Sequence, residues 1–196
     1  MTTAPADVVA EAAARLRPLF PVDEWIARRP MALAAVLVPL IDRPGGLTVL
    51  LTERAADLPD HPGQISFPGG RMEPEDADAA ATALREAEEE VGIPAGSVEV
   101  LGYLSAHMTL TGFALTPVIG LVKPDFEFKL DTREVSQLIE IPLSFLVDFR
   151  NQLTEEREVA GRRLRLPVFD YSGHRVWGAT AFMLADLSQQ LGKQAA

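Results

Sequence analysis

The sequence contains no cysteine, and this absence removes three kinds of chemistry at once. A disulfide, a thiolate metal site and a cysteine nucleophile are all excluded. Any metal ion must therefore be held by oxygen or by histidine nitrogen. The lack of cysteine also fits a reducing compartment.

Long apolar runs are missing as well. No stretch reaches the roughly eighteen apolar residues that mark a membrane-spanning helix. The segment from Met1 to Asp7 has neither the basic start nor the apolar run of a secretory signal. We therefore expect a soluble, cytoplasmic protein that has no membrane partner.

Basic residues are scarce: 18 Lys and Arg stand against 28 Asp and Glu, which gives a net charge of −10. This balance argues against nucleic acid as the main partner, because no broad basic footprint is available. An acidic protein can still bind a phosphorylated small molecule if a metal ion screens the phosphates. Otherwise the acidity simply favours solubility.

The remaining composition is that of an ordinary globular protein, with 47% hydrophobic and 23% charged residues over 196 positions. A chain of this length can bury one real core. We predict a single domain over residues 30–192, preceded by a helical extension over residues 1–29. A homodimer is left open.

Apolar periodicity and turn residues predict the order of the elements. Strands and helices are mixed without strict alternation, which favours an α/β fold with a mixed sheet, an α/β/α sandwich, over a doubly wound parallel sheet. The expected elements are helices at 10–16 and 23–29, strands at 31–41 and 47–52, a loop at 55–70, a helix at 76–91, strands at 98–104 and 113–122, a short helix at 142–147, a hairpin at 155–168 and a helix at 177–191.

The helix at 76–91 is the clearest element, because apolar residues recur along it at spacings of three and four. Asp76 or Asp78 is expected to cap its start. Gly92 suits the left-handed position that ends a helix, and Pro94 prevents continuation.

Three carboxylates share one face of this helix: Glu86, Glu89 and Glu90 stand at i, i+3 and i+4, whereas Glu88 falls on the opposite flank. Like charges at these spacings cost roughly 0.2–0.5 kcal/mol per pair. The helix dipole also disfavours them near the C-terminus. The helix alone leaves two interpretations open, a solvated acidic face or a site for a divalent cation such as Mg²⁺.

The segment from Gly70 to Ile93 resembles the Nudix box, whose second half is matched in full by Arg85-Glu86-Ala87-Glu88-Glu89-Glu90-Val91-Gly92-Ile93. The first half departs from the pattern. Asp76 stands where the box has Glu, and eight residues rather than seven separate it from Arg85. We therefore do not assign Asp76 as a metal ligand.

A segment upstream of the box resembles the motif of the Nudix coenzyme A pyrophosphatases. It runs from Leu50-Leu51-Thr52-Glu53-Arg54-Ala55 through Gly63 to Phe67-Pro68-Gly69-Gly70, and departs from the motif only at Pro59, where the motif has Arg. The insertion in the box also resembles that subfamily. Together the similar segments cover about residues 30–185.

The resemblance implies a Nudix-type α/β/α sandwich and a pyrophosphatase that uses Mg²⁺ or Mn²⁺. Glu86 and Glu90 are the expected metal ligands, with Glu89 as a third ligand or as the general base. The carbonyl of Gly69 is expected to complete the metal shell, since a glycine permits close approach. Glu134 is a second candidate for the general base.

Other polar residues of these motifs are candidates for the substrate or for the scaffold. We expect three side chains to contact substrate phosphate, those of Arg54, Gln64 and Arg71. Arg54 is the strongest candidate, because it is a fixed position of the upstream motif. Arg85 either orients a neighbouring glutamate or forms an ordinary surface ion pair. The three histidines have no metal-ligand spacing, and we expect them in loops or on the surface: His61, His107 and His174.

Three functions remain open from the sequence. The first is hydrolysis of coenzyme A or acyl-coenzyme A to 4′-phosphopantetheine, or its acyl form, and adenosine 3′,5′-bisphosphate. The second is hydrolysis of another small nucleotide substrate, such as ADP-ribose, NADH or a damaged nucleotide. The third is an inactive Nudix domain that only binds a ligand, which the intact set of three glutamates disfavours.

Overall fold

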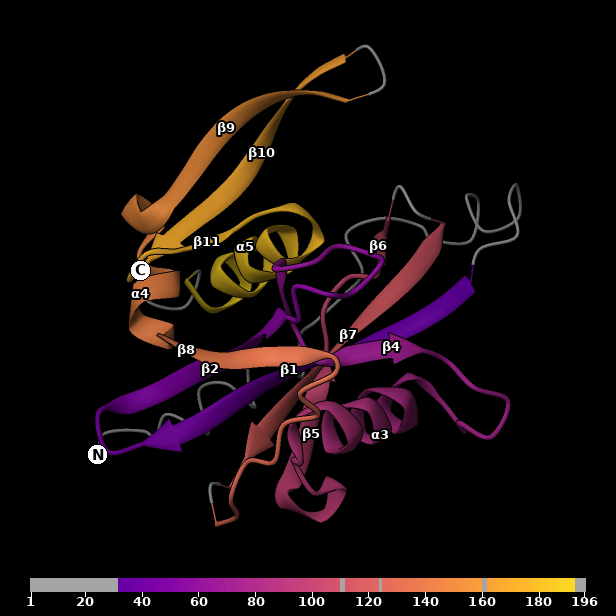
Figure 1. The fold of residues 1–196 in the computed structure, drawn as a ribbon. Helices are drawn as coiled ribbons and strands as arrows, with labels where there is room; N and C mark the ends of the chain where they lie inside the picture. The colour runs from indigo at the N-terminus through magenta and orange to yellow at the C-terminus, as the bar shows by residue number, and fades with distance from the viewer. Residues whose placement is uncertain (1–31, 110–111, 124, 160–161, 193–196) are drawn as a thin grey trace.

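A computed structural model describes residues 32–109, 112–123, 125–159 and 162–192. The extension expected at 1–29, with helices at 10–16 and 23–29, lies outside these ranges. The strands are β1 Ala32–Arg43, β2 Gly46–Arg54, β3 Ile65–Ser66, β4 Gly69–Arg71, β5 Val98–Tyr103, β6 His107–Met108, β7 Phe113–Val122, β8 Val135–Pro142, β9 Gln152–Val159, β10 Arg162–Tyr171 and β11 His174–Val176. The helices are α3 Ala79–Val91, α4 Leu143–Val147 and α5 Gly178–Gly192, with short 3₁₀ turns at Ala95–Ser97 and Phe149–Asn151 (Figure 1).

Eight of the described strands form one mixed sheet around β1. Its central path is β3-β2-β1-β7-β5, while β4 pairs with β1, β6 with β7 and β8 with β2. β7 runs parallel to β1 along its whole length, opposite Ala32 to Ile41, and the other pairs in this sheet are antiparallel. The sequence predicted a mixed sheet because its strands and helices do not alternate strictly, and this prediction is confirmed.

β1 is buried on both faces, which explains why its sequence is a nearly continuous apolar run. Its even-numbered residues Val36, Val38 and Leu40 pack into one core together with α4 and α5. Its odd-numbered residues Ala35, Leu37 and Ile41 pack into a second core under α3. The sheet thus lies between α3 on one face and α4 with α5 on the other, an α/β/α sandwich (Figure 1).

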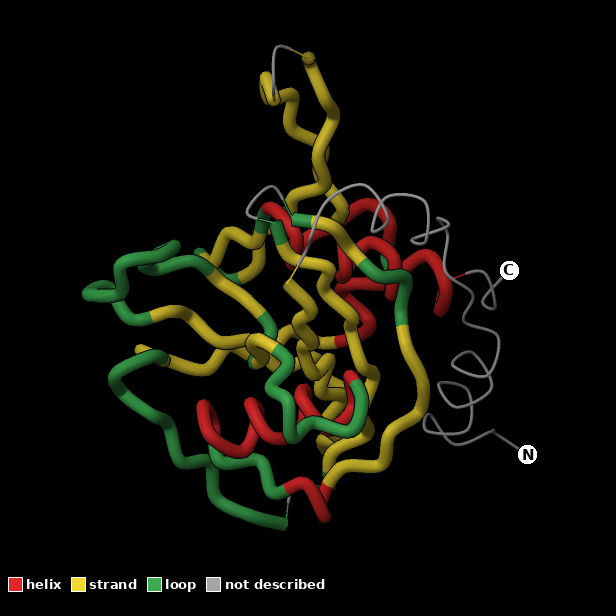
Figure 2. Tube along the Cα trace, turned by 90° about the vertical axis from the view of Figure 1, so that its right-hand side faces the viewer, coloured by secondary structure: helices red, strands yellow, loops and turns green. Residues whose placement is uncertain are grey.

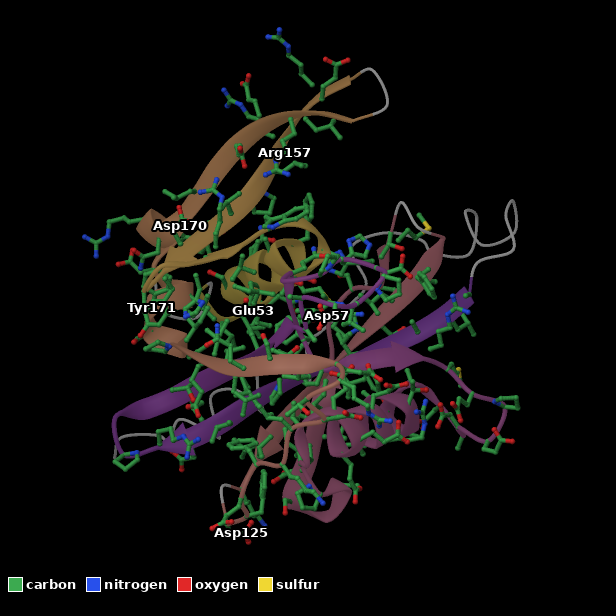
Figure 3. All side chains as sticks on the ribbon, viewed as in Figure 1. Glu53, Asp57, Asp125, Arg157, Asp170 and Tyr171 are labelled. Carbon is green, nitrogen blue, oxygen red and sulfur yellow. The ribbon has the colours of Figure 1, made fainter. Side chains whose placement is uncertain are left out.

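The second sheet is a long hairpin, β9 and β10, to which β11 adds a short third strand. The hairpin is longer than the segment expected at 155–168, and it projects from the body of the molecule (Figure 2). The Arg157 guanidinium, labelled in Figure 3, lies 4.9 Å from the centroid of the Trp177 ring. This contact holds the hairpin against the segment that precedes α5.

The helix that carries the glutamates begins at Ala79, three residues later than the sequence predicts. Asp78 is the capping residue, and its carboxylate accepts a hydrogen bond from the Ala81 amide at 2.8 Å. Asp76 lies before the helix and does not cap it; its carboxylate pairs with Arg85. Gly92 ends the helix with φ at 71°, the left-handed conformation that glycine adopts without strain.

The sequence analysis did not anticipate β8, which pairs with β2. A bulge explains this, because Glu53 pairs with Gln137 but Arg54 pairs with Val135, which leaves Ser136 as an extra residue. The bulge reverses the direction of the side chains, so the segment lacks the strict alternation by which a strand is recognised. The expected loop at 55–70 likewise contains two short strands, β3 and β4.

Candidate active site

The four glutamates of α3 divide into an inner and an outer pair. Glu90 is 6% exposed and Glu86 is half-buried against the sheet, whereas Glu88 and Glu89 are exposed. This is the arrangement that the helical spacing predicts for Glu86, Glu90 and Glu88. Glu89 lies further out than its neighbours, since 61% of its side chain is exposed.

Arg85 holds two of these carboxylates. Its Nη1 atom lies 3.0 Å from Oε1 of Glu86 and 3.2 Å from Oε2 of Glu89. Its Nη2 atom donates to the backbone carbonyl of Arg71 at 3.0 Å, which ties the helix to β4. Of the two roles considered for Arg85, orientation of neighbouring glutamates is the one that the structure displays.

Asp76 is the principal partner of Arg85. Nε and Nη2 of the arginine meet the two carboxylate oxygens at 3.1 and 3.0 Å. Asp76 also accepts from the Glu73 amide at 2.9 Å and from the Thr82 hydroxyl at 3.0 Å. Hydrogen bonding to Arg85 holds the pKa of Asp76 well below its usual range. Asp76 is thus a fixed anion that positions Arg85.

The two glycines of β4 allow the sheet to approach the glutamates. A Cβ atom on Gly70 would overlap the carboxylate of Glu86, and a Cβ on Gly69 would overlap the backbone of Ala35 and Val36. Gly69 and Val36 face each other as a non-hydrogen-bonded pair, between two hydrogen-bonded pairs of the antiparallel β1–β4 ladder. In an antiparallel ladder such a residue turns both its N–H and its C=O away from the partner strand. The N–H of Gly69 donates to Glu90.

The bulge between β2 and β8 brings two more candidates to the glutamates. The Ala55 amide donates to the carbonyl of Glu134 at 2.8 Å, which fixes that residue just before β8. Glu134 is exposed and lies close enough to Glu86 and Glu90 to raise the pKa of each. Arg54 lies close enough to Glu90 to lower its pKa, and its Nε donates to the Asp60 carbonyl at 3.3 Å.

Negative charge dominates the inner part of this cluster. Burial, with the charges of Glu86 and Glu134, raises the pKa of Glu90 to about 8, although Arg54 and the Gly69 amide act in the opposite direction. Burial also raises the pKa of Glu86, against the contribution of Arg85. The nearby cations therefore do not compensate the carboxylates fully, and a further cation would stabilise them.

The remaining phosphate candidates have other neighbours. The guanidinium of Arg71 lies 4.9 Å from the centroid of the Phe113 ring. The side-chain amide of Gln64 lies beside Gly178 at the start of α5. Of the three phosphate candidates, Arg54 is the one whose charge acts on the carboxylate cluster, where it lowers the pKa of Glu90.

One histidine departs from its expected position. His107 was expected in a loop or on the surface, but it lies in β6, and its Nε2 atom is buried without a hydrogen-bond partner among the described residues. Burial lowers the pKa of His107 below its usual value. His61 is exposed in the loop before β3, and His174 is the first residue of β11.

The cluster contains the type of donor atoms that a divalent cation prefers, but the side chains lie too far apart to hold an ion together. In the described ranges, no group of three or more Asp, Glu or His side chains stands close enough to hold an ion. Arg85 holds one carboxylate oxygen each of Glu86 and Glu89. The donors are carboxylate oxygens, which suit a hard cation such as Mg²⁺ or Mn²⁺.

Comparison with known proteins assigns the family. The family model of the NUDIX domain matches residues 31–166, which include the whole carboxylate cluster. The chain belongs to the Nudix family. It is therefore a Nudix hydrolase, an enzyme that acts on a phosphoric anhydride of a nucleoside diphosphate derivative, and Nudix hydrolases generally use divalent metals.

The chain is similar to bacterial proteins described as uncharacterized Nudix hydrolase NudL. It is 41% identical to that of Escherichia coli (strain K12) over 160 residues, which cover 81% of this chain and 82% of the relative. It is 40% identical to that of Photorhabdus laumondii over 158 residues, 81% of this chain and 84% of the relative. A crystal structure of a C. elegans Ap4A hydrolase shares 20% identity at a TM-score of 0.48, over 58% of this chain and 81% of that one.

None of the helices in the described part of the chain is long and apolar enough to cross a membrane. This agrees with the lack of long apolar runs in the sequence.

Proposed function

We propose that the protein hydrolyses coenzyme A or acyl-coenzyme A, with release of 4′-phosphopantetheine, or its acyl form, and adenosine 3′,5′-bisphosphate. The observation that carries the proposal is the position of the upstream motif. Two parts of that motif that are far apart in sequence, Arg54 and Gly69-Gly70, both lie against the glutamates of α3. Residues of the upstream motif thus lie beside the carboxylates that we propose as metal ligands, which supports the subfamily assignment.

Mg²⁺ or Mn²⁺ is the proposed cofactor, held by Glu86 and Glu90, with Glu89 as a further ligand. The carbonyl of Gly69 fits this site, because it faces away from β1 on the same edge as the amide that donates to Glu90. The raised pKa of Glu90 supports a cation here, because the groups around this buried carboxyl do not stabilise its charged form and a bound cation would. When bound, the metal neutralises phosphate oxygens and lowers the pKa of a coordinated water.

The chain itself supplies a proton acceptor and a phosphate contact. Glu134 is exposed beside Glu86 and Glu90 and has no ion pair among the described residues, which supports it as the acceptor of the proton from the attacking water. Glu89 is the alternative acceptor, but it is held by Arg85. Arg54 is the proposed contact to a substrate phosphate, and Gln64 and Arg71 are further candidates for phosphate contacts.

A substrate panel tests this proposal. Purified protein with Mg²⁺ or Mn²⁺ is incubated with coenzyme A, 3′-dephospho-coenzyme A, ADP-ribose and NADH, and the products are separated and quantified. We expect coenzyme A to have the highest kcat/KM and to yield 4′-phosphopantetheine and adenosine 3′,5′-bisphosphate. A tenfold or greater preference for ADP-ribose or NADH, about 1.4 kcal/mol in transition-state stabilisation, would contradict the coenzyme A assignment.

A further inference from the structure

Trp177 is an exposed aromatic residue between β11 and α5, and it is 38% exposed to solvent. The guanidinium of Arg157, from the projecting hairpin, lies 4.9 Å from the centroid of its ring. The indole is therefore held in place by a cation and still presents aromatic surface to solvent.

A short series of contacts joins Trp177 to the glutamates. Arg54 is the residue whose charge acts on Glu90, and its amide donates to the carbonyl of Gln64 at 3.0 Å. The side-chain amide nitrogen of Gln64 lies 3.4 Å from the position of a Cβ atom on Gly178. Gly178 is the neighbour of Trp177 in the chain, so their Cα atoms are roughly 3.8 Å apart. The series thus reaches the ring with no step longer than a side chain.

The residues of this series lie at the surface. Arg54, Gln64 and Gly178 are each partly exposed. The Thr180 hydroxyl donates to the carbonyl of Ile65 at 3.0 Å, which fixes the first turn of α5 against β3. A ligand that contacts Arg54 can therefore extend along the surface to the start of α5, and the two ends of this surface are held at a fixed separation.

The substrates of Nudix hydrolases have a planar group that fits such a ring. A nucleoside diphosphate derivative carries its base one ribose away from its phosphates. Bases stack on tryptophan whatever their identity, because every base has a π face. Gly178, between the phosphate candidate Gln64 and the ring, has no side chain that would obstruct the ribose.

We propose that Trp177 is the platform on which the nucleobase of the substrate stacks. The phosphates then lie at Arg54 and the glutamates, and Arg157 supports the indole from the side opposite the base. The proposal rests on hydrolysis at the glutamates of α3 and not on coenzyme A as the substrate, because coenzyme A, ADP-ribose and NADH all contain an adenosine diphosphate unit.

Tryptophan fluorescence tests the stacking directly. The chain contains two tryptophans, Trp25 and Trp177, so Trp25→Phe leaves Trp177 as the only one. This variant is titrated, with saturating Mg²⁺, with adenosine 5′-(α,β-methylene)diphosphate, a non-hydrolysable form of the shared unit. Methylenediphosphonate, which keeps the phosphorus groups and lacks the nucleoside, is the matched control ligand. We expect saturable quenching by the adenosine analogue and none by methylenediphosphonate.

Isothermal titration calorimetry measures the dissociation constant of the adenosine analogue in further variants, whose fold circular dichroism checks. Trp177→Ala should raise the constant by about tenfold, and Trp177→Phe should stay within about threefold of the wild-type protein, because a phenyl ring still stacks. Phe182→Ala removes another aromatic residue of similar exposure from α5 and should have no effect. Arg157→Ala releases the hairpin from the ring and should raise the constant by less than about threefold.

Three results would overturn the platform: no binding of the adenosine analogue to the wild-type protein, binding without quenching of Trp177, and equal affinity in Trp177→Ala and the wild-type protein. Equal quenching by both ligands, or equal losses in Arg157→Ala and Trp177→Ala, would likewise overturn it, since either result shows an effect that does not depend on the base. A preference for ADP-ribose over coenzyme A contradicts the proposed substrate and leaves the platform in place.

Discussion

Arg85 grips Asp76 with two parallel hydrogen bonds, Nε to Oδ1 at 3.1 Å and Nη2 to Oδ2 at 3.0 Å. The Asp76 side chain is only 7% exposed, and that of Arg85 is 24% exposed. The remaining guanidinium nitrogen is thereby aimed at Glu86 and Glu89. A residue outside the helix thus sets the direction of two carboxylates within it.

We predict that Asp76→Ala lowers the free energy of unfolding, because it leaves the Arg85 guanidinium, which is 24% exposed, without its main partner. Urea denaturation measures the loss. Asp131→Ala is the control, since Asp131 also pairs with an arginine, Arg133, whose side chain is 87% exposed. The loss in the control should be clearly smaller, because an exposed ion pair contributes little to stability. Equal losses in the two variants would show that the Asp76–Arg85 ion pair stabilises the fold no more than an exposed ion pair does.

We predict that Glu86→Gln and Glu90→Gln each reduce kcat by more than about a hundredfold with saturating Mg²⁺, because each removes a charged oxygen ligand from the proposed metal site. Circular dichroism should show an intact helix. Glu88→Gln is the matched control on the exposed flank of α3 and should retain activity within a few-fold. Near-normal turnover by either of the first two variants would remove the metal assignment.

The raised pKa of Glu90 leads to a prediction about pH. The folded protein holds a proton on Glu90 up to about pH 8, whereas the unfolded chain releases it near the ordinary value of 4.5. Between these values the native state binds more protons, so the free energy of unfolding should fall as pH rises from 5 to 8 in the presence of a chelator. We expect a decrease on the order of a few kcal/mol.

Two controls accompany the pH series. Glu90→Gln cannot titrate and should show a flatter profile over the same range. Mg²⁺ should restore stability at pH 8 in the wild-type protein, because it binds the native carboxylates by mass action. A chelated wild-type protein whose stability rises from pH 5 to 8 would contradict the burial of an unpaired carboxylate at this position.

We predict that Arg54→Ala raises KM for coenzyme A more than it lowers kcat, which is the mark of lost uniform binding. The loss of one charge-assisted hydrogen bond costs about 1.5–3 kcal/mol, or roughly ten- to a hundredfold in kcat/KM. Arg165→Ala, on the projecting hairpin and 78% exposed, should leave both constants unchanged. If Arg54→Ala instead left KM unchanged and reduced kcat, Arg54 would interact with the transition state and not with the bound substrate.

The sequence by itself determined the elements whose signals are local. The strands β1 and β7, the helix with Gly92 at its end and the opposed flanks of Glu86 and Glu88 all follow from periodicity and from capping chemistry. The Nudix family followed from nine consecutive motif positions, Arg85 to Ile93, and the family match confirms it.

Only the tertiary structure decided which residues from elsewhere meet those glutamates. Glu134 and Arg54 reach the cluster through a bulge between β2 and β8, a feature of the pairing of two strands that no single segment displays. The partnership of Asp76 with Arg85 and the burial of His107 likewise depend on chain folding over long distances. The raised pKa of Glu90 could not be predicted from the sequence either. Helical spacing shows on which face of α3 Glu90 lies, but the packing of β4 and β8 against that face determines how deeply its carboxylate is buried.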